Sequence, residues 1–192
     1  MVNFLIFGPP GSGKGTQSIR LAEKFNLLHL STGDMLRAEI AAGTELGKRM
    51  SAIMAKGELV PDEVVIEMIA SKIDGAKGYA GFLYDGFPRT VAQAVALEKM
   101  LNQRGMKIDC MLVLEVDRDE LVKRLVLRAE QSGRPDDKDP AVIDNRIEVY
   151  REKTEPIISY FKVKGIYQPV NGVGEIEDIF QRLSDIVVKY LN

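Results

Sequence analysis

The segment Gly8–Thr16, which reads GPPGSGKGT, constrains the fold more than any other part of the sequence. It follows a short apolar run at Val2–Phe7 and precedes an amphipathic stretch, so the chain should pass from a buried strand through a glycine-rich turn into a helix. Glycines allow several backbone N–H groups to converge on one anion, and the helix N-terminus adds partial positive charge there. Lys14 can reach the β- and γ-phosphates of a nucleotide. The segment therefore predicts a phosphate-binding loop.

One detail of this loop departs from the general pattern. Most such loops place Ser or Thr directly after the lysine, whereas here Gly15 intervenes before Thr16. The departure weakens the case for the Thr16 hydroxyl as a direct magnesium ligand.

Short apolar runs alternate with longer amphipathic stretches along the whole chain. The expected strands are Val2–Phe7, Leu27–Ser31, Phe82–Asp85, Cys110–Val116 and Ile166–Val170. The expected helices cover residues 14–25, 33–42, 45–56, 62–73, 90–104, 118–130, 140–162 and 175–190. Near-continuous apolar strands suit a parallel sheet that is covered on both faces. The alternation predicts a doubly wound α/β sheet with right-handed crossovers.

Two connections interrupt the alternation of strands and helices. Between Ser31 and Gly81 the chain forms about three helices before the next strand, which indicates a helical insertion. The second connection, Gln131–Pro140, reads QSGRPDDKDP and is typical of a polar surface loop. A chain of 192 residues is long enough to bury roughly 70% of its surface as one domain that carries these insertions.

Composition narrows the class of protein. The 26 Lys and Arg residues against 28 Asp and Glu residues give a net charge of −2, which argues against a general nucleic-acid binder. Cys110 is the single cysteine, so the chain can hold neither an internal disulfide nor a multi-cysteine zinc site. The longest apolar run is only Cys110–Leu114, too short to span a membrane. With no basic leader before the first strand, we expect a cytoplasmic location.

Several motifs in a fixed order resemble those of the adenylate kinases, a nucleoside monophosphate kinase family of the P-loop kinases. They are the phosphate loop, LSTGDMLR at 30–37, DGFPRT at 85–90 with Gln93 one turn further on, and Arg124, Arg128, GRPDD at 133–137 and Arg146. Together they span the chain from residue 2 to about residue 174. The short, cysteine-free segment around Arg134 resembles the short-lid members of the family, which are usually monomers and carry no structural zinc.

The resemblance implies a P-loop kinase fold with a central five-stranded parallel sheet flanked by helices. It implies one domain over residues 1–192, with a core of 1–30, 61–126 and 138–192, a helical monophosphate-binding insertion at 31–60 and a lid at 127–137. It also implies a cis peptide at Phe87-Pro88 that aims Arg89. Because water competes as the phosphoryl acceptor, we expect the insertion and the lid to close only over bound nucleotides.

The resemblance also assigns roles to individual residues. It implies catalytic roles for Lys14, Asp85, Arg89, Arg128, Arg134 and Arg146. It implies ATP binding by Gly11, Ser12, Gly13, Lys14, Gly15, Thr16, Arg124, Arg128 and Gly174. It implies AMP binding by Thr32, Arg37, Glu58, Leu59, Val60, Gly86, Phe87, Pro88, Arg89, Gln93, Arg134 and Arg146. Asp85 would meet the Mg²⁺ that accompanies ATP, through water, and Thr16 is a second candidate.

The residues themselves support part of this assignment. Asp85 ends an apolar strand, where a carboxylate can meet phosphate-bound Mg²⁺, although Asp is also a favoured helix N-cap. Arginine suits phosphoryl oxygens because its planar guanidinium binds them in pairs. Arg124 and Arg128 share a helix face, and an exposed helix charge is the alternative interpretation of Arg124. Arg146 follows Arg134 by 12 residues, one more than is usual in the family, which predicts a one-residue bulge near Lys138–Pro140.

The implied reaction is MgATP + AMP ⇌ 2 ADP. Its nucleophile is an already ionised phosphate oxygen, so no general base is required, which suits a chain with one histidine and one cysteine. We expect the lone His29 to be a packed or surface strand residue. A UMP/CMP kinase shares most of these motifs, but Thr32 favours AMP. A regulatory GTPase would need Asn-Lys-x-Asp and Asp-x-x-Gly, which this chain lacks, and a non-catalytic nucleotide-binding module would typically have lost Lys14, Asp85 or the lid arginines.

Overall fold

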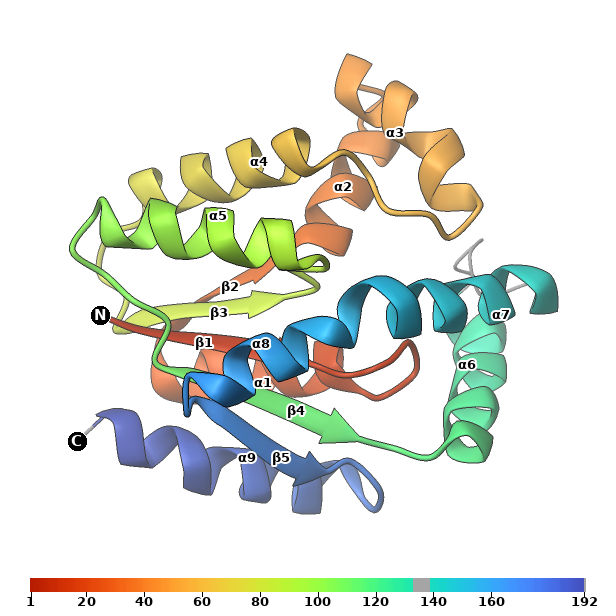
Figure 1. The fold of residues 1–192 in the computed structure, drawn as a ribbon. Coiled ribbons are helices and arrows are strands. Elements are labelled where there is room, and N and C mark those ends of the chain that lie inside the picture. The colour runs from red at the N-terminus through yellow and green to blue at the C-terminus, as the bar shows by residue number, and fades with distance from the viewer. Residues whose placement is uncertain (133–138, 192) are drawn as a thin grey trace.

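The computed structural model describes residues 1–132 and 139–191 of the chain, without the side chains of 129–132. Its centre is a five-stranded, fully parallel sheet with the strand order β2-β3-β1-β4-β5 (Figure 1). The strands are β1 (Val2–Phe7), β2 (Leu27–Ser31), β3 (Gly81–Asp85), β4 (Cys110–Glu115) and β5 (Tyr167–Asn171). The predicted α/β class and the parallel five-stranded sheet are therefore confirmed.

Three strands differ from the prediction by one residue at one or both ends. β3 begins at Gly81, β4 ends at Glu115, and β5 runs one residue later than expected. Gly81 pairs with Val2 of β1 and Leu27 of β2, so the backbone ladder starts before the apolar run does. Side-chain polarity does not report such backbone pairing, which explains the small shifts.

The helices follow the predicted order. They are α1 (Lys14–Phe25), α2 (Thr32–Ala41), α3 (Glu45–Ala55), α4 (Asp62–Gly75), α5 (Val91–Asn102), α6 (Arg118–Ser132), α7 (Pro140–Val149), α8 (Pro156–Val163) and α9 (Ile176–Leu191). Hydroxyl or carboxylate side chains at Ser31, Thr44, Thr90 and Asp139 accept a backbone N–H at the starts of α2, α3, α5 and α7. These residue types are favoured N-caps, because they satisfy N–H groups that have no partner within the helix.

The prediction of one long helix over residues 140–162 is wrong. The chain instead forms α7, a π-helical turn at Tyr150–Thr154, and α8. Within the wide turn, the Glu155 N–H donates to the Tyr150 carbonyl oxygen at 2.8 Å, five residues back. Pro156 has no N–H to donate to the carbonyl four residues before it, so an ordinary α-helical ladder cannot continue through this point.

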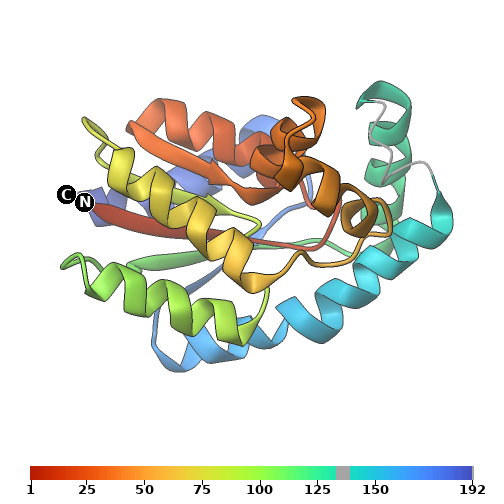
Figure 2. The same ribbon diagram turned by 90° about the horizontal axis from the view of Figure 1, so that it is seen from above.

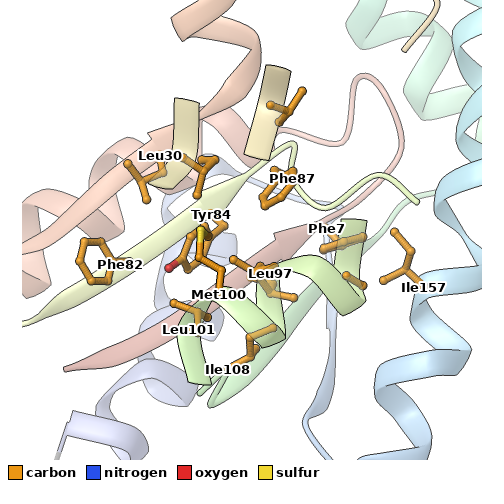
Figure 3. Packing of buried hydrophobic residues seen from close by; sticks show 14 of the residues in the cluster. Phe7, Leu30, Phe82, Tyr84, Phe87, Leu97, Met100, Leu101, Ile108 and Ile157 are labelled. Atoms are coloured by element: carbon orange, nitrogen blue, oxygen red, sulfur yellow. The ribbon is translucent and has the colours of Figure 1, made fainter. Parts of the chain in front are cut away.

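Helices cover both faces of the sheet. On one face α4, α5 and α8 pack against residues such as Phe7, Phe82 and Tyr84, and Figure 3 shows Leu97, Leu101 and Ile157 joining them. On the other face α1 and α9 bury a second set of apolar side chains. Cys110 belongs to that second set and is fully buried, as expected of a core residue. The sheet, buried on both faces, thus holds the loops at its carboxyl edge in place.

The remaining helices gather at the carboxyl edge of the strands. Figure 2 shows α2 and α3 on one side of this edge and α6 with α7 on the other. α6 continues to Ser132, so the first part of the predicted lid is helical, while residues 133–138 lie outside the described structure. The predicted bulge near Lys138–Pro140 lies partly outside it as well, and in its described part Asp139 caps α7.

Candidate functional site

A cavity of about 580 Å³ opens between the phosphate loop, α6 and the start of α9. Its walls include Pro10 to Gln17, Ser31, Gly33, Asp34, Arg37, Asp85, Gly86, Arg89, Glu120, Arg124, Leu127, Arg128, Arg146, Gly174 and Ile176. A second cavity lies beneath α2 and the segment that precedes α4, and Thr32, Leu36, Arg37, Glu58, Leu59, Val60, Gly86, Arg89, Gln93 and Arg146 line it. The two cavities share Gly33, Arg37, Gly86, Arg89 and Arg146.

The phosphate loop is built by backbone conformations that only glycine adopts without strain. Gly11 has φ +87°, and a Cβ there would lie 2.9 Å from both the Leu121 carbonyl oxygen and Leu125 Cγ. Gly13 has φ +89° and forms the N-cap of α1, which presents its first N–H groups to the cavity. An anion in the cavity would therefore meet the positive end of α1, as the sequence predicts.

Lys14 stands at the first position of α1 beside this loop. Its Nζ donates to the Pro9 carbonyl oxygen at 3.4 Å and lines the same cavity. Burial lowers the pKa of the Lys14 ammonium from 10.5 to about 8; the Asp85 carboxylate opposes this shift, while Arg89, Arg146 and Arg128 reinforce it. The surrounding arginines make the cavity strongly cationic, which an incoming phosphate would relieve.

Asp85 closes β3 at the floor of the large cavity and is buried. Its Oδ2 lies 3.3 Å from His29 Nε2 on the neighbouring strand β2. The pairing of Ser31 with Asp85 places His29 two residues earlier on β2, so the two side chains point to the same face. His29 is a partly buried strand residue, as expected, and its contact with Asp85 has no counterpart in the sequence prediction. Asp85 is not a helix N-cap here.

Arg89 is fixed at three points. Its Nε donates to the Gly86 carbonyl oxygen at 2.8 Å, its backbone N–H donates to Gln93 Oε1 at 2.7 Å, and its carbonyl oxygen accepts from the Thr154 hydroxyl at 3.0 Å. The peptide between Phe87 and Pro88 is cis, as predicted. The guanidinium is thereby held at the border shared by the two cavities.

Most of the remaining residues predicted for a monophosphate line the second cavity, whereas Phe87 and Pro88 line a neighbouring pocket. Gln93 is buried, and its Nε2 donates to Asp62 Oδ1 at 2.6 Å. Thr32 is also buried, and its hydroxyl donates to the Gly86 carbonyl oxygen at 2.8 Å. Arg37 pairs with Asp34 at 2.5 Å on the rim. The sequence analysis missed Asp62, because nothing in its position at the start of α4 indicates that its side chain reaches α5.

The arginines predicted near the lid divide into three cases. Arg128 and Arg146 line the large cavity, and Arg146 also lines the second one. Arg124 lines the large cavity too, but its Nε donates to Glu120 at 2.7 Å and its Nη1 to the Gly172 carbonyl oxygen at 3.0 Å. Arg134 lies outside the described residues. Gly174 reaches the large cavity with φ +119°.

The comparison with known proteins agrees with this geometry over nearly the full chain. Residues 6–166 match the family model described as adenylate kinase. The chain belongs to the adenylate kinase family. It is 50% identical over 187 residues to an adenylate kinase of Phocaeicola vulgatus, with 97% of each chain covered. It is also 49% identical to one of Bacteroides thetaiotaomicron, covering 98% and 100% of the two chains, and 51% identical to one of Maricaulis maris, covering 93% and 94%.

Adenylate kinases generally use Mg²⁺ together with ATP, and the site has the donors that this ion prefers. Mg²⁺ favours hard oxygen ligands, keeps several waters, and is usually bound by one or two carboxylates plus substrate phosphates. Asp85 supplies a buried carboxylate on the cavity floor, and Thr16 supplies a hydroxyl on its exposed wall. Within residues 1–132 and 139–191, no group of three or more His, Cys, Asp or Glu side chains could hold a metal. One carboxylate and one hydroxyl suit an ion that nucleotide phosphates also bind.

In this family member, the described part of the chain contains no helix long and apolar enough to cross a membrane.

Proposed function

We propose that the chain catalyses the reversible, Mg²⁺-dependent transfer of the terminal phosphoryl group of ATP to AMP, which yields two ADP. The observation that carries this proposal is the shared wall of the two cavities, where Arg89 and Arg146 face both. Two phosphate-bearing ligands would meet at these guanidinium groups, one from the phosphate loop and one from the second cavity. Membership of the adenylate kinase family supports the same reaction.

The proposed ATP site is the large cavity. Gly11–Thr16 would hold the triphosphate, with Lys14 on its transferring end, and Arg124, Arg128 and Gly174 would contact the rest of ATP. The bond from Arg124 to Glu120 supports a role as a fixed wall beside the base, because the planar guanidinium is already oriented. Asp85, with Thr16 as the second candidate, would hold waters of the metal ion. That ion neutralises developing charge on the phosphoryl oxygens when it is bound.

The proposed AMP site is the second cavity. Arg37, Arg89 and Arg146, with Arg134 from the lid, would hold its phosphate. Phe87 and Pro88 support Arg89, while Thr32, Gly86, Gln93 and the Glu58–Val60 segment would surround its base. The AMP phosphate oxygen is the nucleophile and is ionised near neutral pH, so the chain needs no general base. Catalysis then consists of positioning and charge neutralisation by Lys14 and the arginines.

A coupled assay that follows ADP formation tests this function. With ATP as donor, AMP should be used far better than UMP or CMP, because the Thr32 and Gln93 side chains line the base cavity. Equal or better use of UMP or CMP would make the chain a pyrimidine nucleotide kinase, the runner-up. Omission of Mg²⁺ should abolish turnover.

We also propose that the insertion 31–60 and the lid 127–137 close over bound nucleotides against a core of 1–30, 61–126 and 138–192. Two contacts already bridge the insertion and α7. Asn145 Nδ2 donates to the Lys56 carbonyl oxygen at 2.8 Å, and Arg146 packs so closely on Gly57 that a Cβ added there would lie 2.5 Å from Arg146 Cγ. Hydrogen exchange with and without a bisubstrate analogue measures the closure. Both segments should become protected, and equal exchange in the two states would contradict the proposal.

Following its resemblance to short-lid members, we propose that the protein acts as a monomer in the cytoplasm, with nucleotides rather than nucleic acid or membrane as its partners. Sedimentation with and without nucleotide would report the monomer directly.

A further inference from the structure

The Gln93 side-chain amide is held in one orientation by two partners of unambiguous chemistry. The Arg89 backbone N–H can only donate, and it lies 2.7 Å from Gln93 Oε1. The Asp62 carboxylate can only accept, and its Oδ1 lies 2.6 Å from Gln93 Nε2. These two partners therefore fix which end of the amide is oxygen and which is nitrogen. Rotation of the amide by 180° would place the amide N–H against the Arg89 N–H and the amide oxygen against the Asp62 carboxylate.

The rest of the surroundings strengthens this arrangement. Gln93 is 2% exposed, so water cannot replace a lost partner at little cost. Thr90 caps α5 by accepting the Gln93 N–H at 3.1 Å, and its hydroxyl lies 3.5 Å from Asp62 Oδ2. Asp62 thus connects the first turn of α4 to the first turn of α5, and it does so without lining either nucleotide cavity.

We propose that Asp62 determines base specificity by fixing the orientation of the Gln93 amide. The inference rests on the proposed function, in which Gln93 faces the base of the monophosphate. An amide nitrogen has two hydrogens and an amide oxygen two lone pairs, so each bond described above leaves one for a ligand.

The fixed amide distinguishes between purines. Adenine presents an acceptor at N1 and a donor at N6, which match one N–H and one C=O of an amide. Hypoxanthine and guanine present a donor at N1–H and an acceptor at O6, so they require the opposite orientation. With Asp62 and Arg89 holding Gln93, a 6-oxopurine meets donor against donor and acceptor against acceptor. A site whose buried polar groups are left unpaired rejects such an analogue strongly.

The test compares three variants with AMP and IMP as acceptors and saturating ATP as donor. Asp62→Ala removes the acceptor, Asp62→Asn keeps a neutral one, and Glu63→Ala removes an exposed carboxylate from the same helical turn. The preference for AMP over IMP in kcat/KM should fall about tenfold in Asp62→Ala and less in Asp62→Asn, since hydrogen bonds to charged groups are the stronger ones. It should stay unchanged in Glu63→Ala.

The loss in Asp62→Ala should appear mainly in KM for AMP, with kcat at saturating AMP retained, because Asp62 acts through Gln93 and touches no reacting atom. An AMP:IMP preference in Asp62→Ala within twofold of that in Glu63→Ala would overturn the proposal. If Asp62→Ala does not fold, the AMP:IMP preference of Asp62→Asn tests the proposal instead, because a threefold change in that preference is measurable. Failure of the unmodified protein to phosphorylate AMP would instead refute the proposed function.

Discussion

Replacing Arg89 by lysine is expected to lower kcat/KM for AMP by about 10²- to 10³-fold, equivalent to about 3–4 kcal/mol of transition-state stabilisation. The Arg89 guanidinium donates through Nε to the Gly86 carbonyl oxygen and faces both cavities. A lysine ammonium is a point charge on a flexible stem, so it keeps the positive charge but loses this anchored, forked geometry. Initial rates at varied AMP and saturating ATP would measure the effect.

Arg104→Lys provides the matched control for this change. Arg104 also uses a planar fork, donating to both Asp74 carboxylate oxygens at 2.7 and 2.8 Å, and it lies outside both cavities. The change should leave the kinetics within about twofold of the original protein, because Arg104 lies outside both cavities and a surface ion pair contributes little to stability. Unchanged AMP kinetics in Arg89→Lys would refute the role proposed for Arg89.

Replacing Lys14 by methionine should reduce turnover by about 10³-fold while making the nucleotide-free protein more resistant to heat. The side chain has the same reach without the charge that the transferring phosphoryl group needs. The burial and neighbouring arginines that lower the pKa of Lys14 also make its charge unfavourable in the folded state. Thermal melting distinguishes this outcome from misfolding, which would lower the midpoint. Lys24→Met, at the exposed end of the same helix, should change neither turnover nor melting appreciably.

The pKa of about 8 for Lys14 also predicts how nucleotide affinity depends on pH. Below pH 8 the ammonium is present before binding, whereas above it the protein must take up a proton as the phosphates restore the charge. ATP affinity should therefore fall as pH rises through 8. Calorimetry at pH 8.5 in buffers of different ionisation enthalpy should detect proton uptake that is absent in Lys14→Met.

Ionisation of Lys14 also makes folding stability depend on pH, but in the opposite direction to ATP affinity. The unfolded chain keeps the Lys14 proton up to its ordinary pKa of 10.5, while the folded, nucleotide-free protein releases it near pH 8. The unfolded state thus binds more protons between these values, and the unfavourable contribution of Lys14 to stability declines as pH rises from 8 to 10.5. Activity and stability therefore place opposite demands on this one charge.

Most of the fold could be predicted because local signals and the sheet agree. The apolar runs locate all five strands to within one residue at each end, and cap residues such as Thr44 and Thr90 mark helix starts. The exception is the expected helix over 140–162, where amphipathic periodicity continues across Pro156 although the backbone ladder cannot. Periodicity reports which side chains face the core, and it does not report which backbone bonds are made.

The site was less completely predictable, because some of its contacts join residues far apart in the chain. The phosphate loop and the DGFPR segment are local, and the structure brings Lys14, Asp85 and Arg89 to one cavity as expected. The His29–Asp85 contact depends on which strands become neighbours, and the Asp62–Gln93 bond depends on how two helices pack. Neither arrangement has a signature in the spacing of the residues. The part of the lid that contains Arg134 stays a prediction.

The wide turn at Tyr150–Thr154 has a consequence for how this chain tolerates changes in length. Each residue of a helix advances the chain by about 100° around the axis. Deleting one residue between Arg146 and Pro156, with the wide turn kept, would rotate Arg146 by that angle relative to α8. The Arg146 side chain would then no longer face the two cavities, while α8 would keep Ile157 and Phe161 in the core. The number of residues in this segment therefore sets the rotational orientation of α7 relative to α8, and that number is constrained more strictly than the residue types.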